Sequence, residues 1–356
     1  MADDTEDDAF DGTSEASEIT PVGVKLGSTR TVLQYPKNGE METVRTLTCL
    51  ATYEDAITGE EKVLYGEQAA QEFPDTVEFM LRSGLPEDDD RAELAAKFFR
   101  ELVRAQDIPE DSVVVYAIPT IDNDEGLENL TEVIEDSPIG NHQVRSFPES
   151  LCGAVPAMGD GLEAIDEVFV AVNMGSTNLE ACAYRHAEQL EPFSTGAVTG
   201  GEVDRRIANA VEEETQGRVN IDLTTAREYK EEHGDFNEFE PFTDVIQQPG
   251  GGSHEFTIER GVMDPLDEYV DEAVDEIANN FLSELANTHM KPYQIALGKP
   301  IALTGGMACI PGIEEVFEER LSAELDRDIT VVAADRPDLA AAQGAQRIAA
   351  KLADNL

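Results

Sequence analysis

Three short apolar segments, far apart in the chain, constrain its fold most: residues 22–33, 168–184 and 299–317. Each is an apolar run that ends in a turn of small residues. In the first two, a second apolar run follows, which is the pattern of a strand, a tight turn and a strand. Gly27 and Gly175 occupy these turns, where glycine lets the backbone approach a ligand without a Cβ clash. Together the segments predict one nucleotide-binding site.

Hydroxyl side chains follow both of these glycines, and they are Ser28, Thr29, Ser176 and Thr177. Hydroxyls beside successive backbone N–H groups suit phosphate oxygens, because such N–H groups form anion-binding concavities. The third segment ends a strand at Gly305 and Gly306. Two glycines there let a flat group lie against the backbone.

The order of these motifs resembles the layout of the actin, heat-shock-chaperone and sugar-kinase superfamily. The first hairpin is similar to its phosphate-1 loop, the second to its phosphate-2 loop, and the third segment to its adenosine motif. One phosphate loop opens each half, as in a duplicated domain. The resemblance implies an α/β actin-like ATPase fold of two ribonuclease-H-like domains, each with a small inserted subdomain.

The length of 356 residues suits two domains better than one core. Residues 1–20 carry eight acids, no base and little to bury, which predicts a disordered acidic tail. The predicted boundaries are 21–158 for domain I with a small subdomain IB at about 37–75, and 159–356 for domain II with a small subdomain IIB at about 203–262.

The net charge is −50, from 75 acidic and 25 basic residues, and the acids run through the whole chain. Outside the predicted tail they lie on the polar faces of periodic helices. A pervasive acidic surface with few lysines is typical of halophile proteins, so we expect a source with multimolar salt in its cytoplasm. The charge also argues against nucleic acid and anionic membranes as partners.

The four cysteines show no paired spacing and lie in apolar settings: Cys49, Cys152, Cys182 and Cys309. This predicts buried free thiols and no disulfide or metal role. The sequence contains no signal peptide, no long apolar span and no terminal amphipathic helix with basic residues, so we expect a cytoplasmic protein without a membrane helix.

Two other segments predict parts of the core. Residues 113–118 are too apolar for an exposed strand and predict a central strand covered on both faces. Asp264 and Pro265 are expected to begin a helix as its cap and first residue. The apolar stripe of that helix predicts a core position, with a filament contact as the alternative.

Within the superfamily, residues from about 22 to 349 resemble the bacterial cytoskeletal protein MreB. The matching helical stretches are 147–157, 224–234, 263–277 and 333–345. With the acidic composition, the chain resembles haloarchaeal actin homologues of the salactin or volactin type, and the sequence does not choose between them. The resemblance implies a self-assembling homopolymer filament that binds ATP or ADP between its halves.

The resemblance also assigns site residues. Those expected to bind nucleotide are Lys25, Gly27, Ser28, Thr29, Gly175, Ser176, Thr177, Gly201, Glu202, Arg227, Lys230, Gly305, Gly306 and Met307. Glu149 corresponds to the glutamate that orients the attacking water, and a carboxylate suits this work because it accepts a hydrogen bond from water aimed at the γ-phosphorus. The alternative for Glu149 is a surface acid at a helix start.

Two positions depart from the family. Relatives usually have aspartate in both phosphate hairpins, where the pair holds the water shell of Mg²⁺, but this chain has Lys25 and Asn173. Mg²⁺ needs oxygen ligands, whereas an ammonium can pair with phosphate oxygens directly. We therefore expect reduced Mg²⁺ dependence, an indirect role through water for Asn173, and weak ATPase activity. The alternative is that Lys25 points away and neighbouring acids hold the ion.

Two other functions are compatible with this superfamily. The main alternative is a small-molecule kinase of the sugar-kinase type, and a chaperone ATPase is the third candidate. A chaperone would need a substrate-binding domain for which the chain has no room. A sugar kinase would normally carry a catalytic aspartate for its acceptor and larger insertions. A filament-forming protein with a slow ATPase is therefore the leading hypothesis.

Overall fold

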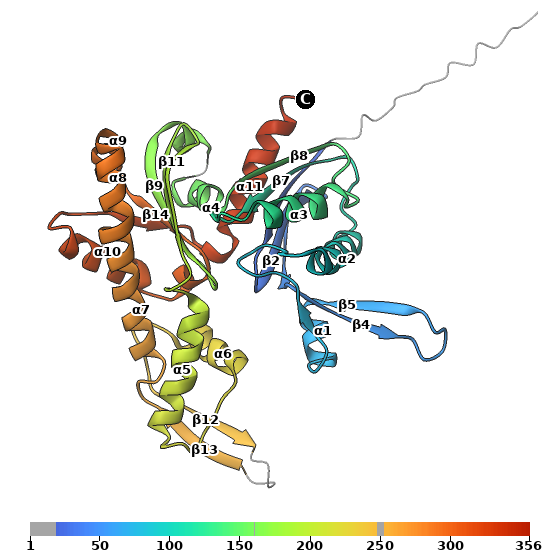
Figure 1. The fold of residues 1–356 in the computed structure, drawn as a ribbon, viewed down its shortest axis with the longest axis horizontal. Coiled ribbons are helices and arrows are strands. Elements are labelled where there is room, and N and C mark those ends of the chain that lie inside the picture. The colour runs from blue at the N-terminus through green and yellow to red at the C-terminus, as the bar shows by residue number, and fades with distance from the viewer. Residues whose placement is uncertain (1–18, 160, 248–252) are drawn as a thin grey trace, which may run out of the picture.

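The computed structural model describes residues 19–159, 161–247 and 253–356. Figure 1 shows its helices and strands. The predicted acidic tail falls mainly on residues 1–18, which lie outside the described residues, and Thr20 already begins a strand.

The first large sheet has five strands in the order β3-β2-β1-β7-β8. Strand β1 pairs antiparallel with β2 and parallel with β7. The strands are β1 (Thr20–Leu26), β2 (Arg30–Lys37), β3 (Glu40–Leu47), β7 (Ser112–Ile118) and β8 (Gln143–Pro148). Every residue of β7 except the last is buried, which confirms the predicted central strand.

The second large sheet repeats this plan in the order β11-β10-β9-β14-β15. Strand β9 pairs antiparallel with β10 and parallel with β14, as β1 does with β2 and β7. The strands are β9 (Val168–Met174), β10 (Leu179–Arg185), β11 (Glu188–Thr195), β14 (Ile301–Thr304) and β15 (Val331–Ala333). The hairpins β1–β2 and β9–β10 thus occupy equivalent places in the two sheets.

Helices α4 (Glu149–Ala157) and α11 (Pro337–Ala353) lie between the two sheets (Figure 1). Cys152 of α4 joins α11 and β7 in one apolar cluster, while Leu151 of α4 joins β9 in another. The two helices approach closely at Gly344, where an added Cβ would lie 1.8 Å from the Cys152 carbonyl oxygen. Helix α4 therefore connects the two halves, and its first residue, Glu149, lines the cleft described in the next subsection.

Other helices cover the outer faces of the sheets. Phe98 and Leu102 of α2 pack on the first sheet, and Leu266, Val270 and Ile277 pack on the second. The covering elements are α2 (Asp89–Gln106), α3 (Asp124–Glu135), α7 (Met263–Asp275), the π-helix η2 (Glu276–Leu282), α8 (Ser283–Thr288), α9 (Met290–Ala296) and α10 (Ile313–Glu324), with the 3₁₀ turn η1 (Glu163–Asp166) before β9.

The long helix at α7 confirms one prediction and corrects another. Its apolar stripe is buried in the core of the second half, as expected. Asp264 is not its cap, because α7 begins at Met263 and the Asp264 carboxylate accepts hydrogen bonds from the Arg260 guanidinium, at 2.9 Å from Nη2. The charged partner one turn earlier competes for the carboxylate and draws it away from the helix N-terminus.

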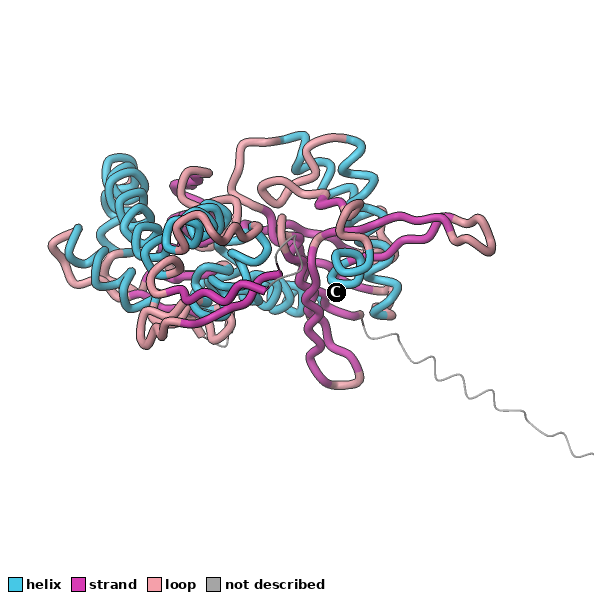
Figure 2. The backbone as a smooth tube through the Cα atoms, turned by 90° about the horizontal axis from the view of Figure 1, so that it is seen from below, coloured by secondary structure: helices cyan, strands magenta, loops and turns pink. Residues whose placement is uncertain are grey.

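Two smaller parts extend from the same end of the molecule (Figure 1). One contains β4 (Cys49–Glu54), β5 (Glu61–Tyr65), β6 (Glu78–Phe79) and α1 (Gly66–Glu72), and the other contains α5 (Gly200–Glu214), α6 (Leu223–His233), β12 (Phe242–Gln247) and β13 (Ser253–Ile258). Figure 2 shows the β4–β5 hairpin reaching beyond its surroundings. Because β3 pairs in the large sheet, the first small sheet begins later than the range expected for subdomain IB.

Among the described helices, none combines the length and the apolar character that crossing a membrane requires.

Candidate functional site

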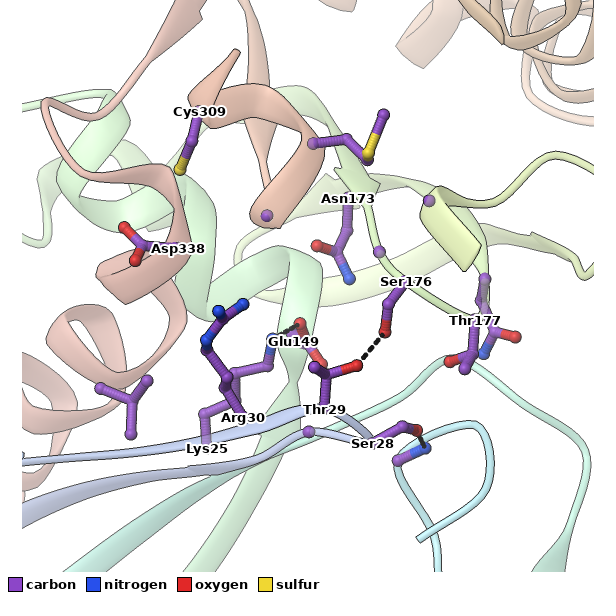
Figure 3. Close-up of a pocket in the computed structure, with 18 of the residues that line it drawn as sticks. Lys25, Ser28, Thr29, Arg30, Glu149, Asn173, Ser176, Thr177, Cys309 and Asp338 are labelled. Carbon is purple, nitrogen blue, oxygen red and sulfur yellow. Dashed lines mark hydrogen bonds and ion pairs between the residues drawn. The ribbon is translucent and has the colours of Figure 1, made fainter. Parts of the chain in front are cut away.

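A cavity of about 320 Å³ lies where the two hairpins, α6 and the turn after β14 meet. Figure 3 shows the side chains that converge on it. Of the residues predicted for the site, those that line this cleft are Lys25, Gly27, Ser28, Thr29, Glu149, Asn173, Gly175, Ser176, Thr177, Arg227, Lys230, Gly306 and Met307. The structure thus brings together residues that are up to 282 positions apart in the sequence, from Lys25 to Met307.

Three predicted residues do not line the cleft: Gly201, Glu202 and Gly305. The Gly201 N–H donates to the Ser176 carbonyl oxygen at 2.8 Å, so it supports the second hairpin. Glu202 binds Arg205 at 2.5 Å on the outside of α5. Gly305 has a φ of +95°, and an added Cβ would lie 2.4 Å from the Met174 carbonyl oxygen. Close approach between β14 and β9 therefore requires glycine at this position.

The two hairpin turns face each other and have the same backbone geometry. The Gly27 N–H donates to Arg30 at 3.1 Å, and the Gly175 N–H donates to Asn178 at 2.9 Å. At either glycine an added Cβ would lie 2.8 Å from that same carbonyl oxygen. The Thr29 hydroxyl donates to the Ser176 hydroxyl at 3.1 Å across the cleft (Figure 3). The hydroxyls expected to meet phosphate therefore lie on opposite walls of one narrow space.

Lys25 points into the cleft, where its ammonium lies 2.9 Å from the Glu149 carboxylate (Figure 3). The possibility that Lys25 points away is therefore wrong. Burial alone would lower the pKa of Lys25, but the charge and hydrogen bond of Glu149 outweigh it and raise the pKa. Glu149 begins α4 with its side chain only 12 % exposed, so it is not a surface acid. Its backbone position follows from Pro148, which ends β8 and precedes the helix.

Glu180 is a site residue that the sequence analysis missed. It lies on β10 directly opposite Asn173 of β9, and the two residues are 2 % and 3 % exposed. Burial and the nearby Glu149 charge raise the pKa of Glu180 to about 7. A signal was present, because β10 is otherwise apolar until Arg185 and a single acid in such a strand needs a reason. Finding it required the strand register, which places residues 173 and 180 side by side.

Two ion-pair groups border the mouth of the cleft. The Arg30 guanidinium on β2 forms a bidentate pair with Glu231 of α6, at 2.8 and 2.9 Å, and so joins the two halves. The Asp338 carboxylate lies 3.0 Å from Arg45 and 3.1 Å from Arg336. None of these residues was expected from sequence. The pairs Arg30–Glu231 and Arg45–Asp338 join elements that only the fold brings together, whereas Arg336 and Asp338 are neighbours at the start of α11.

Lys230 lines the cleft, but its ammonium is already engaged. It lies 2.5 Å from the Asp204 carboxylate and donates to the Gly200 carbonyl oxygen at 3.0 Å. Burial raises the pKa of Asp204 even though the Lys230 charge opposes this effect. Lys230 thus ties α6 to α5, while Arg227 on the same helix also lines the cleft.

The cysteine prediction is correct for Cys49, Cys152 and Cys182, which are buried free thiols. It is wrong for Cys309, which is exposed at the edge of the cleft. This residue ends the 3₁₀ turn η3 (Gly306–Cys309), in which Met307 and Ala308 are buried while Gly306 and Cys309 at its two ends are exposed.

The residues present fit a divalent cation in one respect. The Asn173 Oδ1 and Glu180 Oε2 atoms are buried and have no hydrogen-bond partner among the described residues. Oxygen atoms of this kind are the ligands that Mg²⁺ or its bound waters prefer. The described residues contain no cluster of three or more side chains able to ligate a metal, so any such ion would need further ligands from a nucleotide.

Comparison with known proteins gives four results. The Salactin family model matches residues 19–353. The protein Salactin of Halobacterium salinarum is 63% identical over 358 residues, with 99% of each chain covered. Among solved structures, MreB5 of Spiroplasma citri bound to AMPPNP has a TM-score of 0.75 at 16% identity, covering 95% of this chain and 98% of that one. The MamK double helical filament has a TM-score of 0.70 at 17% identity, covering 93% and 98%. The predicted actin-like fold is confirmed.

Proposed function

The chain belongs to the Salactin family, and we propose that it is an actin-like protein that binds ATP and assembles with copies of itself into filaments in high salt. Family membership selects the salactin type from the two types that the sequence left open. The structural likeness to MreB and MamK supports a cytoskeletal filament protein, since the MamK relative was solved as a double helical filament.

The observation that carries the nucleotide proposal is the pair of facing hairpins. Thr29 and Ser176 are 3.1 Å apart, and each follows a glycine turn whose backbone can approach a ligand closely. The related MreB5 structures hold AMPPNP and ADP, which supports ATP and ADP as the ligands here. In this proposal Gly306 and Met307 border the adenosine, and Arg227 lies near the ribose.

Lys25 and Glu149 suggest how ATP hydrolysis proceeds and why it is slow. Before nucleotide enters, the two charges neutralise each other at 2.9 Å. A terminal phosphate competes for the Lys25 ammonium, because charge-assisted hydrogen bonds to phosphate are strong. Glu149 is then free to accept a hydrogen bond from the attacking water. Since this exchange separates a buried ion pair, we expect hydrolysis to be slow.

Mg²⁺ bound with the nucleotide would neutralise part of the phosphate charge, and Asn173 and Glu180 are the residues that fit its hydration shell. Lys25 supplies one fixed positive charge in the same cleft. We therefore propose that nucleotide binding depends less on Mg²⁺ than in relatives with two aspartates.

Filament assembly is proposed to need high salt because of the charge of −50 on each subunit. At 0.1 M salt the Debye length is about 10 Å, so acidic surfaces repel each other across an interface. At multimolar salt it falls to about 3 Å or less, and only contacting charges matter.

Sedimentation and light scattering in a KCl series test this proposal. With ATP, polymer should rise between about 0.5 and 3 M KCl, because the screening length shortens over that range, and it should reverse on dilution. A parallel screen of sugar phosphorylation separates the filament from the kinase alternative. Polymer that is abundant in 0.1 M KCl and lost at 3 M, or rapid sugar phosphorylation without polymer, would contradict the proposal.

A further inference from the structure

The floor of the cleft holds two buried oxygen atoms without partners. Asn173 and Glu180 are register partners on adjacent antiparallel strands, so their side chains lie on the same face of the sheet. Both residues line the cleft, and both are more than nine-tenths buried. Asn173 Oδ1 and Glu180 Oε2 receive no hydrogen bond from any described residue. Buried acceptors are rarely left this way, so these two point to something that the protein alone does not supply.

The charges around these atoms show what is missing. The Lys25 ammonium is 2.9 Å from Glu149, and that pair is neutral. Glu180 forms no ion pair with a described residue, and the groups that face its carboxylate are neutral: the Asn178 amide at 3.5 Å, the Asn173 amide and the Thr120 backbone N–H. The nearest cation that acts on Glu180 is the Lys25 ammonium, which is already paired with Glu149, so a further cation would stabilise the ionised Glu180 carboxylate.

An oxygen-only set consisting of a carboxylate and an amide is suited to a hard divalent cation. We infer that Glu180, assisted by Asn173, is the residue through which this cleft holds the hydrated divalent cation that accompanies the nucleotide. The inference rests on the proposed nucleotide binding and concerns a residue that replaces two absent aspartates. In relatives the carboxylates lie on the strands that precede the two turns, whereas in this chain the carboxylate lies on β10, the strand that follows the second turn.

If this assignment is correct, the affinity of the cleft for a divalent cation depends mainly on the Glu180 side chain. Glu180→Gln keeps the size and both polar atoms of the side chain but removes the charge. Asn173→Asp keeps the size and adds a charge beside Glu180. The two variants should move cation affinity in opposite directions, and misfolding cannot produce that result.

The experiment measures Mn²⁺ binding to the full-length protein by electron paramagnetic resonance in 3 M KCl, with and without the ATP analogue AMPPNP. Because removal of a partner group typically weakens metal binding by 10–100-fold, Glu180→Gln should raise the Mn²⁺ dissociation constant at least about tenfold in the presence of nucleotide. Asn173→Asp should lower it. The control is Glu319→Gln, an exposed position on α10, which should leave the dissociation constant unchanged.

Unchanged Mn²⁺ affinity in Glu180→Gln would overturn the inference. It would also be overturned if the affinity of the parent protein for AMPPNP did not change with Mn²⁺ but did change when tetramethylammonium replaced K⁺. Binding of AMPPNP measured in EDTA separates the two levels of the argument. If the parent protein binds no nucleotide with or without Mn²⁺, the proposed function fails and the inference fails with it. If nucleotide binds and the Mn²⁺ dissociation constant is the same in the parent and in Glu180→Gln, only the inference fails.

Discussion

The hairpins β1–β2 and β9–β10 have the same backbone conformation at their turns but present different side chains to the cleft, a base in the first and an amide and an acid in the second. In each, the first turn glycine donates to a carbonyl three residues later, and a residue two positions earlier faces the cleft. In the first hairpin that residue is Lys25, which pairs in register with the apolar Val32. In the second it is Asn173, which pairs with Glu180.

This difference teaches how a duplicated unit divides its work. The glycine turns are the same because both hairpins must approach one ligand closely, and any Cβ there would strike a carbonyl oxygen. The residues two positions before the glycines can differ between the hairpins, because binding of the ligand depends on the total charge around it. In our proposal the first hairpin supplies a cation from the protein, Lys25, and the second supplies oxygen acceptors for a cation from solution.

The largest effect should come from a change that acts on the ligand shared by both hairpins. Gly306→Asp places a carboxylate in the cleft, where an added Cβ meets no atom within 4 Å, so the fold should persist. Gly306 is exposed in the free protein, and bound adenosine would cover the new carboxylate without giving it a partner. Desolvation of one ion costs several kcal/mol, so we expect affinity for an ATP analogue to fall about a thousandfold. Fluorescence titration measures it, with circular dichroism as the folding control. Parent-like affinity would show that the nucleotide does not lie here.

A second change removes the partner of the first hairpin alone. Glu149→Ala should slow phosphate release at least about a hundredfold, because general-base groups contribute about 10²–10⁴. ATP affinity should change little, since Lys25 stays available to phosphate. Filaments of this variant should persist longer. Phosphate release is measured per unit of polymer against Glu319→Gln, and equal rates would remove Glu149 from the mechanism.

The third change makes the two hairpins alike. Lys25→Asp together with Asn173→Asp removes the fixed cation and restores two carboxylates at the matched positions. We expect ATP binding to become more Mg²⁺-dependent by about tenfold, in line with the usual effect of ligand-supporting groups, and hydrolysis to increase. Isothermal titration over a Mg²⁺ series gives the answer. A double variant with the metal titration and turnover of the parent would mean that these positions do not set the charge of the site.

The smallest effect concerns the contact between the first hairpin and α6. Glu231→Gln breaks the bidentate pair with Arg30, and since exposed pairs contribute about 0–1 kcal/mol, nucleotide release should quicken about fivefold or less.

The pH dependence of this contact has a defined direction. Burial would raise the pKa of Glu231, but the bonds from Arg30 outweigh it and lower the pKa below 4.5. The pair therefore acts above pH 4.5 and is lost as the pH falls through the lowered pKa. Stopped-flow release should differ between parent and variant at pH 7 and converge in acid, whereas a difference independent of pH would exclude Glu231 as the cause.

The features that sequence predicted best are local. Gly27 and Gly175 lie where close backbone approach demands glycine, and that demand is visible without the fold, whereas Gly305 meets β9 and not the cleft. The apolar stripe of α7 likewise depends only on helical spacing. The prediction that Asp264 caps this helix was wrong because Arg260, one turn earlier, competes for its carboxylate.

The features that sequence could not provide depend on register and on contacts between distant segments. Glu180 enters the site because β10 pairs with β9 at one particular register, and a shift of one residue would turn it to the other face. The Lys25–Glu149 pair requires α4 to pass below the first hairpin. Glu180 carries a local signal, a single acid in an otherwise apolar strand, but its neighbour Asn173 and the contact between Lys25 and Glu149 follow only from the fold.

The division of work between the hairpins is tested most directly by an electron cryo-microscopy structure of the filament formed with AMPPNP and Mg²⁺ in 3 M KCl. We predict the terminal phosphate at hydrogen-bond distance from Lys25, with Glu149 released from that ammonium, and cation density beside Glu180 and Asn173. A structure in which Lys25 remains paired with Glu149 while the phosphates contact neither hairpin, with no density beside Glu180, would contradict the account.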